Sequence, residues 1–412
     1  MVSQAAPSVA PPSKNSRVHP WIVIAAAAAL LLGCSAPKRN PVPIEKMTAV
    51  EIAGMPGVRA WGDEASPQFQ ADIEQSIRDE HEADYPPVDG RRSYAALLIS
   101  GGGDSGSFGA GFLEGWTEAG TRPKFKLVTG ISVSALIAPF AFLGSDHDPQ
   151  LKAAFTTIDR HDIYKRRNVF KVLGSESVVK TDPLAELIAG FLDRDFLEAV
   201  AREHDRGRRL YVATTNLDAQ RLVIWNMGLI ARHADERALE LFRRILLASA
   251  AIPVAFPPVY FEVVADGERY DEMHVDGGII NQFFFFGATL DLLEGAGRGT
   301  VYIIRNDEVG PAPEHIPRKM ARIASRSVDT LIKATAIGDL FRVYSIARLG
   351  AIDVKYVGIP EDFKKQSQDL FDTEDMRRLF EIGRALALDD APWRTTPPGL
   401  EMLEADPTDA GP

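Results

Sequence analysis

The apolar and polar positions of this chain change between strand and helix periods in a regular order. Ala95–Ile99 is an uninterrupted apolar run of strand length, as in a strand buried on both faces. A glycine-rich segment leads from it into 107–119, which has a helical pattern in spite of its glycines. A second strand at 125–129 and a second helix ending at Leu143 follow. This order predicts a three-layer α/β fold, with a mainly parallel central sheet flanked by helices.

The same patterns predict the elements of the remaining chain. Strands are expected at 210–215, 222–225, 273–275, 301–305 and, at an edge, 354–357, and helices at 148–157, 183–192, 236–248, 317–349 and 373–388. The four aromatic residues Phe283–Phe286 are expected in the core, with the wall of an acyl-chain groove as the alternative. The tail from Asp389 is rich in prolines and acidic residues, which predicts mobility.

The turn after the second strand has small residues on both sides of a serine. A nucleophilic serine at a sharp strand-to-helix turn needs tiny residues two positions before and after it, because strand and helix approach closely there. Gly130 and Ser134 flank Ser132 in this way. With Ser134 as the nucleophile, Leu136 would occupy the second tight position and clash. Ser132 is therefore the predicted nucleophile.

The glycine-rich segment offers backbone N–H groups for an oxyanion. Gly101, Gly102 and Gly103 lack a Cβ and accept positive φ, so their N–H groups can point inward. Gly106 at the start of the next helix adds the helix dipole in the same sense. The loop alone would also suit a phosphate or a dinucleotide, but no P-loop lysine follows it and no acidic residue lies at the ribose-binding distance. Together with the serine turn, it predicts acyl transfer.

A candidate base lies far along the chain. Asp276 follows the strand predicted at 273–275, and Gly277 and Gly278 let the backbone turn sharply, so that the carboxylate can approach a serine on a neighbouring strand. Alone, Asp-Gly-Gly is an ordinary turn. To act as a base, Asp276 must lie within about 2.6–3.2 Å of the Ser132 hydroxyl. Partial burial would raise its pKa and make it more basic than an exposed aspartate.

Glycine loop, serine turn and Asp-Gly-Gly in this order resemble the patatin-like phospholipases. The resemblance spans about 94–305 and includes Thr181–Leu184, Tyr211–Leu217, Ser249–Pro253 and Phe256–Val259. It implies a serine acyl hydrolase that cleaves fatty-acyl esters of membrane lipids, of phospholipase A or lysophospholipase type. Ser132 and Asp276 would form a dyad without histidine, Gly101 to Gly103 the oxyanion loop, and no cofactor would be needed.

Two positions depart from the family pattern. Ser134 stands where the turn usually has glycine, and Asp104 stands where the loop usually carries a basic residue. We expect Asp104 to cap the helix that follows. The departures leave open a non-catalytic envelope lipoprotein that keeps the fold. A second alternative is an esterase for small esters, with a triad completed by His274 or His315.

Composition and charge restrict the kinds of partner that the chain is expected to bind. The chain has 412 residues and a formal net charge of −11, which argues against a nucleic-acid partner. No His, Cys, Asp or Glu residues have metal-ligand spacing, so no metal is expected. The basic segment 160–180 is expected to be either a solvated loop or a contact for anionic lipid head groups. The oligomeric state stays open.

The single cysteine suggests how the chain reaches a membrane. Cys34 follows basic residues and the apolar run Trp21–Leu32, which is too short to span a bilayer but fits a secretory signal. Leu-Leu-Gly-Cys at its end resembles the bacterial lipoprotein box, and Ser35 resembles the signal for the outer membrane, facing the periplasm. The sequence thus predicts a signal peptide over 1–33 and a diacylated thiol at Cys34. A tether and N-terminal elaboration (34–87), a hydrolase domain (88–360) and a C-terminal helix with a mobile tail (361–412) follow.

Overall fold

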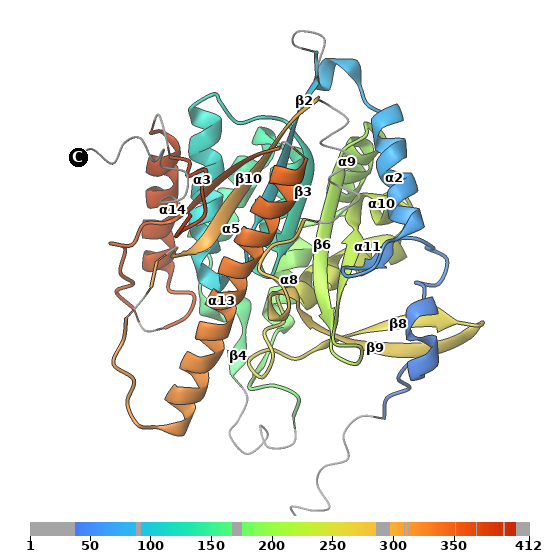
Figure 1. The fold of residues 1–412 in the computed structure, drawn as a ribbon. Coiled ribbons are helices and arrows are strands. Elements are labelled where there is room, and N and C mark those ends of the chain that lie inside the picture. Colours follow the sequence, from blue (N-terminus) through green and yellow to red (C-terminus); the bar gives the residue numbers. More distant parts are fainter. Residues whose placement is uncertain are drawn as a thin grey trace, which may run out of the picture.

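The protein is described by a computed structural model. The described residues are 38–87, 92–166, 175–285, 297–308, 310–311, 313–350, 352–367, 369–389 and 392–400. They fold into a central sheet with helices on both faces, as predicted (Figure 1). Cys34 and the signal peptide predicted over 1–33 lie outside the described residues.

Within the described residues, the central sheet has nine strands. Seven of them follow the order β1-β7-β6-β3-β2-β10-β11, and β9 of the β8–β9 hairpin also pairs with β6. The pairs among β11, β10, β2, β3 and β6 are parallel, whereas β1, β7 and the hairpin pair antiparallel. The strands are β1 (Arg59–Trp61), β2 (Arg92–Ile99), β3 (Phe125–Ile131), β6 (Arg209–Asn216), β7 (Arg221–Asn226), β8 (Val259–Ala265), β9 (Glu268–Asp276), β10 (Gly297–Glu308) and β11 (Asp353–Ile359). Each predicted strand is present, extended by a few residues.

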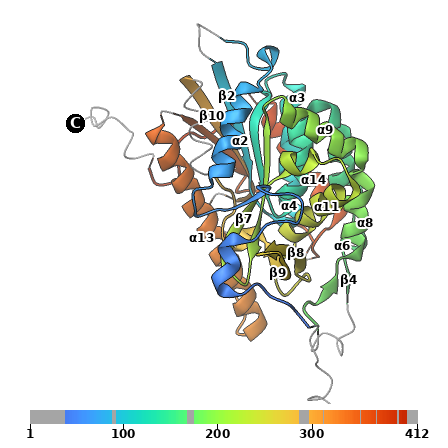
Figure 2. The ribbon, with the colours of Figure 1, turned by 90° about the vertical axis from the view of Figure 1, so that its right-hand side faces the viewer.

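Two helical layers cover the sheet (Figure 2). One face packs against α2 (Pro67–Arg78) and α13 (Met320–Leu349). The other carries the larger core, formed with α3 (Gly106–Glu118), α4 (Val133–Leu143), α5 (Asp148–Thr156), α6 (Arg160–Ile163), α8 (Asp182–Phe191), α9 (Arg194–Asp205), α10 (Met227–Ala231), α11 (Glu236–Ser249) and α14 (Thr373–Ala387). The helix predicted over 183–192 starts one residue earlier, at Asp182, and Thr181 is its N-cap residue.

Burial on both faces explains why β2 reads as a continuous apolar run. Successive side chains of a strand point to opposite faces. Leu97 and Ile99 enter the larger core, while Ala96 and Leu98 enter the smaller one. Phe283, Phe284 and Phe285 also belong to the smaller core, as expected, whereas Phe286 lies outside the described residues.

The C-terminal part of the chain belongs to the same body as the hydrolase fold. A Cβ at Gly111 would lie 1.9 Å from the Phe380 carbonyl oxygen, so this glycine lets α3 and α14 touch. Residues 392–400 are not the mobile tail that their composition predicts. Trp393 packs against Phe112 and Trp116 and so covers the aromatic cluster on α3.

The N-terminal segment is also bound to the fold. β1 adds an antiparallel edge strand beside β7. The tether expected to begin at residue 34 is already fixed at Arg39, which forms ion pairs with Asp218 and Asp271 at 2.6 and 2.7 Å. Of the basic segment 160–180, the described part includes a short two-stranded sheet of β4 (Lys165–Arg166) and β5 (Val179–Lys180). Among the described residues, no helix is long and apolar enough to cross a membrane.

Candidate active site

Strand β6 brings the two candidate catalytic residues together. β3 pairs with the first part of β6 and ends with Ile131 opposite Ala213. The next residue of β6, Thr214, pairs with Asp276 at the end of β9. Ile131, the residue before Ser132, and Asp276 therefore lie beside two consecutive residues of β6. The Ser132 hydroxyl donates a hydrogen bond to Asp276 Oδ2 at 2.7 Å.

The serine turn has the strained geometry of a nucleophile elbow. Ser132 has φ 59° and ψ −133°, a conformation that costs a non-glycine residue about 1–3 kcal/mol. A Cβ at Gly130 would lie 2.3 Å from the Ser134 carbonyl oxygen, so only glycine fits there. Ser134 is accommodated because its hydroxyl donates to the Ser100 carbonyl and accepts from Asn306 Nδ2 at 3.0 Å. Its departure from the family pattern therefore leaves the turn intact.

A buried serine on α11 holds the elbow in place. The Ser249 hydroxyl accepts from the Ser132 N–H at 3.0 Å and donates to the Ala213 carbonyl at 2.7 Å. The Asp276 N–H donates to the Ala251 carbonyl at 2.9 Å. In the sequence, 249–253 stands out only through the family resemblance, which gives Ser249 no role of its own. A single small polar residue at the end of a helix does not otherwise indicate a functional role in the sequence.

Burial sets the basicity of Asp276. The residue is 5% exposed, and its carboxylate accepts from the Ser132 hydroxyl and from the Gly278 N–H at 2.7 Å. Burial raises the pKa of this carboxyl to about 7, while the two hydrogen bonds act in the lowering direction. A base with a pKa near neutrality is matched to proton transfer at neutral pH.

The glycine loop keeps two open amides near the elbow. The Gly101 N–H already donates to the Gln282 carbonyl at 3.3 Å, so it is engaged elsewhere and does not fit the predicted oxyanion role. Within the described part of the chain, the N–H groups of Gly102 and Gly103 donate to no carbonyl or side chain. Both have positive φ, 150° and 58°. A Cβ at Gly102 would lie 2.5 Å from the Asn306 carbonyl oxygen, so glycine is required.

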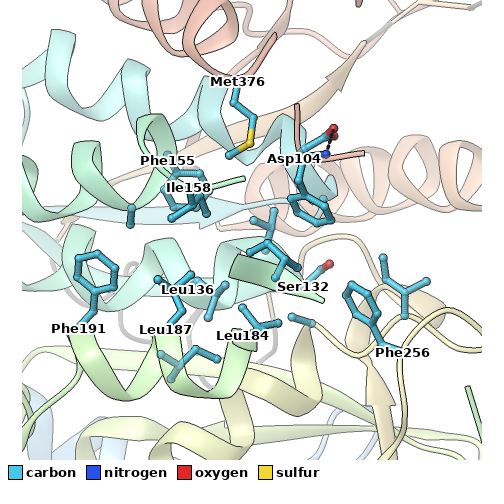
Figure 3. Close-up of a pocket in the computed structure, with 18 of the residues that line it drawn as sticks. Asp104, Ser132, Leu136, Phe155, Ile158, Leu184, Leu187, Phe191, Phe256 and Met376 are labelled. Atoms are coloured by element: carbon cyan, nitrogen blue, oxygen red, sulfur yellow. Dashed lines mark hydrogen bonds between the residues drawn. The ribbon is translucent and has the colours of Figure 1, made fainter. Parts of the chain in front are cut away.

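Asp104 does not cap α3, contrary to the prediction. Its carboxylate forms an ion pair with Lys365 Nζ at 2.5 Å and accepts from the Phe371 N–H at 3.1 Å. The ion pair neutralises the charge, and Figure 3 shows the carboxylate directed away from the Ser132 hydroxyl. Because Lys365 and Phe371 come from the segment before α14, Asp104 joins the glycine loop to that segment.

An apolar pocket opens beside Ser132 (Figure 3). Leu136 of α4, Phe155 of α5 and Leu187 of α8 are among its walls, and Phe191 lies at the far end from Ser132 in this view. Near the elbow, Gly103, Asp104 and Ser132 contribute to the lining. The remaining lining residues are apolar: Val133, Phe140, Ala154, Ile158, Ile163, Leu184, Ile188, Leu192, Ala250, Ile252, Phe256, Phe371 and Met376. Phe283–Phe285 are not part of this wall; they lie in the smaller core and line a separate cavity beside α2 and α13.

The histidines do not complete a triad. His274 is buried, with Nδ1 2.8 Å from the Thr214 hydroxyl and Nε2 3.2 Å from Glu272 Oε2, and burial lowers its pKa. His315 is exposed in the segment before α13. Neither ring contacts Ser132 or Asp276. Within the described residues, no group of three or more His, Cys, Asp or Glu could hold a metal ion.

One comparison with known proteins covers the residues of this site. A model of the patatin-like phospholipase family, a family of lipid acyl hydrolases, matches residues 97–288, which include the glycine loop, Ser132 and Asp276. Among solved structures, VipD from Legionella pneumophila matches with 15% identity and a TM-score of 0.37, over 75% of this chain and 70% of that one. A search of curated proteins finds no match. Residues 97–288 of this chain therefore match the patatin-like phospholipase family.

Proposed function

We propose that the chain is a serine acyl hydrolase that cleaves fatty-acyl esters of membrane phospholipids or lysophospholipids. The observation that carries the proposal is the 2.7 Å hydrogen bond from the Ser132 hydroxyl to the buried Asp276 carboxylate, at the end of an apolar pocket. An apolar pocket suits a fatty-acyl chain, because apolar walls remove its surface from water.

In the first half of the reaction, Asp276 accepts the Ser132 proton as Oγ attacks the acyl carbonyl carbon. Negative charge then develops on the former carbonyl oxygen, where the Gly102 and Gly103 N–H groups and the N-terminus of α4 would stabilise it. The C–O bond to the leaving alcohol breaks, and Asp276 returns the proton to that alcohol. The acyl group is left as an ester of Ser132.

In the second half, water replaces the alcohol. Asp276 accepts a proton from the water as its oxygen attacks the acyl-serine carbonyl, and the same N–H groups stabilise the second oxyanion. The bond to Ser132 Oγ breaks, the serine recovers the proton from Asp276, and the fatty acid leaves. Each half needs one base of near-neutral pKa and no histidine.

The two departures from the family pattern, Ser134 and Asp104, do not favour the non-catalytic alternative. The Ser134 hydroxyl donates one hydrogen bond to Ser100 and accepts one from Asn306. The Asp104 charge is paired with Lys365. Neither residue obstructs the Ser132–Asp276 contact.

We further propose that the chain is a lipoprotein of a bacterial envelope, anchored through acylated Cys34 and facing the periplasm from the outer membrane. This rests on the sequence 14–35 alone. Fatty-acid labelling and membrane retention should both be lost in Cys34→Ala. Unchanged retention and labelling would contradict the anchor.

Mass-spectrometric analysis of products from mixed envelope lipids tests the activity. Free fatty acids and the matching lysolipids should appear with the wild-type chain and be absent with Ser132→Ala. Thr157→Ala, an exposed hydroxyl on the C-cap of α5, is a matched control and should retain the products. A folded wild-type chain that releases no fatty acid from any lipid would contradict the proposal.

A further inference from the structure

The first half of α13 projects from the body of the protein. All its described residues from Met320 to Thr335 are exposed or half-exposed, and the first buried residue is Ala336. At 1.5 Å per residue, this half is roughly 24 Å long. Isolated helices of this length are marginal in water, so the packed second half must supply the nucleus for it. In Figure 1 it extends beyond the lower end of the sheet.

The two halves of α13 carry apolar residues on opposite sides. In the second half, Leu340 and Val343 pack into the smaller core. In the first half, Met320, Ile323 and Leu331 recur at helical spacing but are 87%, 52% and 67% exposed. Leu331 and Leu340 are nine positions apart, which is two and a half turns, so their side chains leave on opposite faces. The first half therefore presents its apolar stripe away from the core.

The polar face of the same segment is basic. Between 314 and 333 there are five Lys or Arg residues, Arg318, Lys319, Arg322, Arg326 and Lys333, and two acidic ones, Glu314 and Asp329, in a chain of net charge −11. Glu314 pairs with Arg322 and Arg326, which leaves the segment positive overall. An apolar stripe with a Lys- and Arg-rich polar face is typical of helices that lie in the interface of an anionic membrane.

The apolar stripe is connected to the active site because α13 is hydrogen-bonded to the loop that follows Asp276. Asp339 accepts from Asn281 Nδ2 at 2.7 Å and from the Gln282 N–H at 2.6 Å, so the helix is fixed to the loop that follows Asp276. One residue of the pocket lining, Ile252, is apolar and 37% exposed. Val254, two positions further along the chain, is 75% exposed with a strained φ of 70°.

The described chain starts at the same end of the molecule (Figure 1). Arg39 is held there by Asp218 and Asp271. Cys34 precedes Arg39 by five residues, which reach at most about 18 Å when fully extended. An acyl chain on Cys34 would therefore keep this end close to the membrane.

We infer that residues 320–335 of α13 form a membrane-docking helix that inserts its apolar stripe into an anionic lipid surface and presents the pocket mouth to it. The inference rests on the proposed function, because it supplies the route by which a lipid substrate would reach Ser132. Anionic lipid is the occupant because the helix is cationic where the chain as a whole is anionic.

A site-specific fluorophore tests the inference. In the full chain with Cys34→Ala, a cysteine introduced by Leu331→Cys is the only thiol, and Leu349→Cys offers a control on the same helix that is 85% exposed. With an environment-sensitive dye, position 331 should blue-shift on phosphatidylglycerol/phosphatidylcholine vesicles, more weakly on phosphatidylcholine alone, and position 349 should not shift. No shift at 331, or equal shifts at both positions, would overturn the inference. A shift at 331 that needs no vesicles and grows with protein concentration would assign the stripe to a second copy instead.

A matched pair of variants measures how much the apolar stripe contributes to the vesicle-induced dye shift. Ile323→Gln with Leu331→Gln removes two apolar side chains from the stripe and should reduce the vesicle-induced shift of a dye at position 328, introduced by Val328→Cys, at least about tenfold at fixed lipid. Leu349→Gln should leave that shift unchanged. Hydrolysis of a soluble short-chain ester, compared with Ser132→Ala, reports on the proposed function separately. Ester hydrolysis without the shift would refute docking alone, and the shift without hydrolysis would refute the proposed chemistry alone.

Discussion

Replacing Asp276 with Asn should make the protein more stable at alkaline pH while abolishing turnover. Burial raises the pKa of this carboxyl from its ordinary value of 3.8 to about 7. A rise of about three pH units corresponds to about 4 kcal/mol of unfavourable free energy in the ionised folded state. Asn is neutral and avoids this cost. Its single oxygen can accept from only one of the Ser132 and Gly278 donors, which costs about 1 kcal/mol, so the net gain should be about 3 kcal/mol.

The pH dependence of that gain identifies its cause. Between about pH 4 and 7, the folded state holds the Asp276 proton and the unfolded state does not, so the wild-type free energy of unfolding falls as pH rises. The slope from this one group is about 1.4 kcal/mol per pH unit. Above about pH 8 both states are ionised, and the penalty is constant. The Asn variant has no such proton.

Urea unfolding of the wild type and Asp276→Asn, measured from pH 4 to 8.5, checks this. All other titrating groups contribute to both proteins, so the difference between the two free energies of unfolding isolates Asp276. We expect the variant to be no more stable than the wild type near pH 4 and about 3 kcal/mol more stable at pH 8. A difference that does not change with pH, or a less stable variant at pH 8, would refute the reasoning.

Three further outcomes follow from the same geometry. Because Asp276 must be ionised to act as the base, kcat/KM for a soluble ester should rise about tenfold per pH unit below pH 7 and level off above it, and a profile flat from pH 5 to 8 would contradict this. Ser249→Ala should lower kcat about tenfold or more while circular dichroism is unchanged, because the elbow loses its support, and unaltered kcat would refute that role. Gly130→Ala should prevent folding or lower the melting temperature sharply, whereas Gly190→Ala, where a Cβ meets nothing within 4 Å, should raise it slightly, and a tolerated Gly130→Ala would contradict the tight elbow.

The sequence predicts the strands and the contact between Ser132 and Asp276 well, because local pattern encodes both. Residues 95–99 of β2 are all apolar because both faces of the strand are buried there. The elbow at Ser132 needs small neighbours at fixed offsets, which are visible in the sequence. Asp276 follows a strand and precedes two glycines, so its turn is visible too. Their meeting depends only on the order of strands around β6.

The supporting contacts could not be predicted, because they join positions far apart in the chain. Asp104 was a reasonable helix cap by local rules, but Lys365, 261 positions away, offers an ion pair instead. The Gly101 N–H is occupied by Gln282 only because β9 and its loop return beside the glycine loop. Trp393 looked like part of a mobile tail, but it covers an aromatic cluster on α3.

The rate of labelling by a fluorophosphonate tests the central claim most directly. At pH 8 the intact wild-type chain should gain one adduct, and peptide mapping should place it on Ser132. Ser132→Ala should gain none, and folded Asp276→Asn should react at least about a hundredfold more slowly, because the buried base is lost. An adduct on another residue, or equal labelling rates in the wild type and Asp276→Asn, would contradict a Ser132–Asp276 dyad.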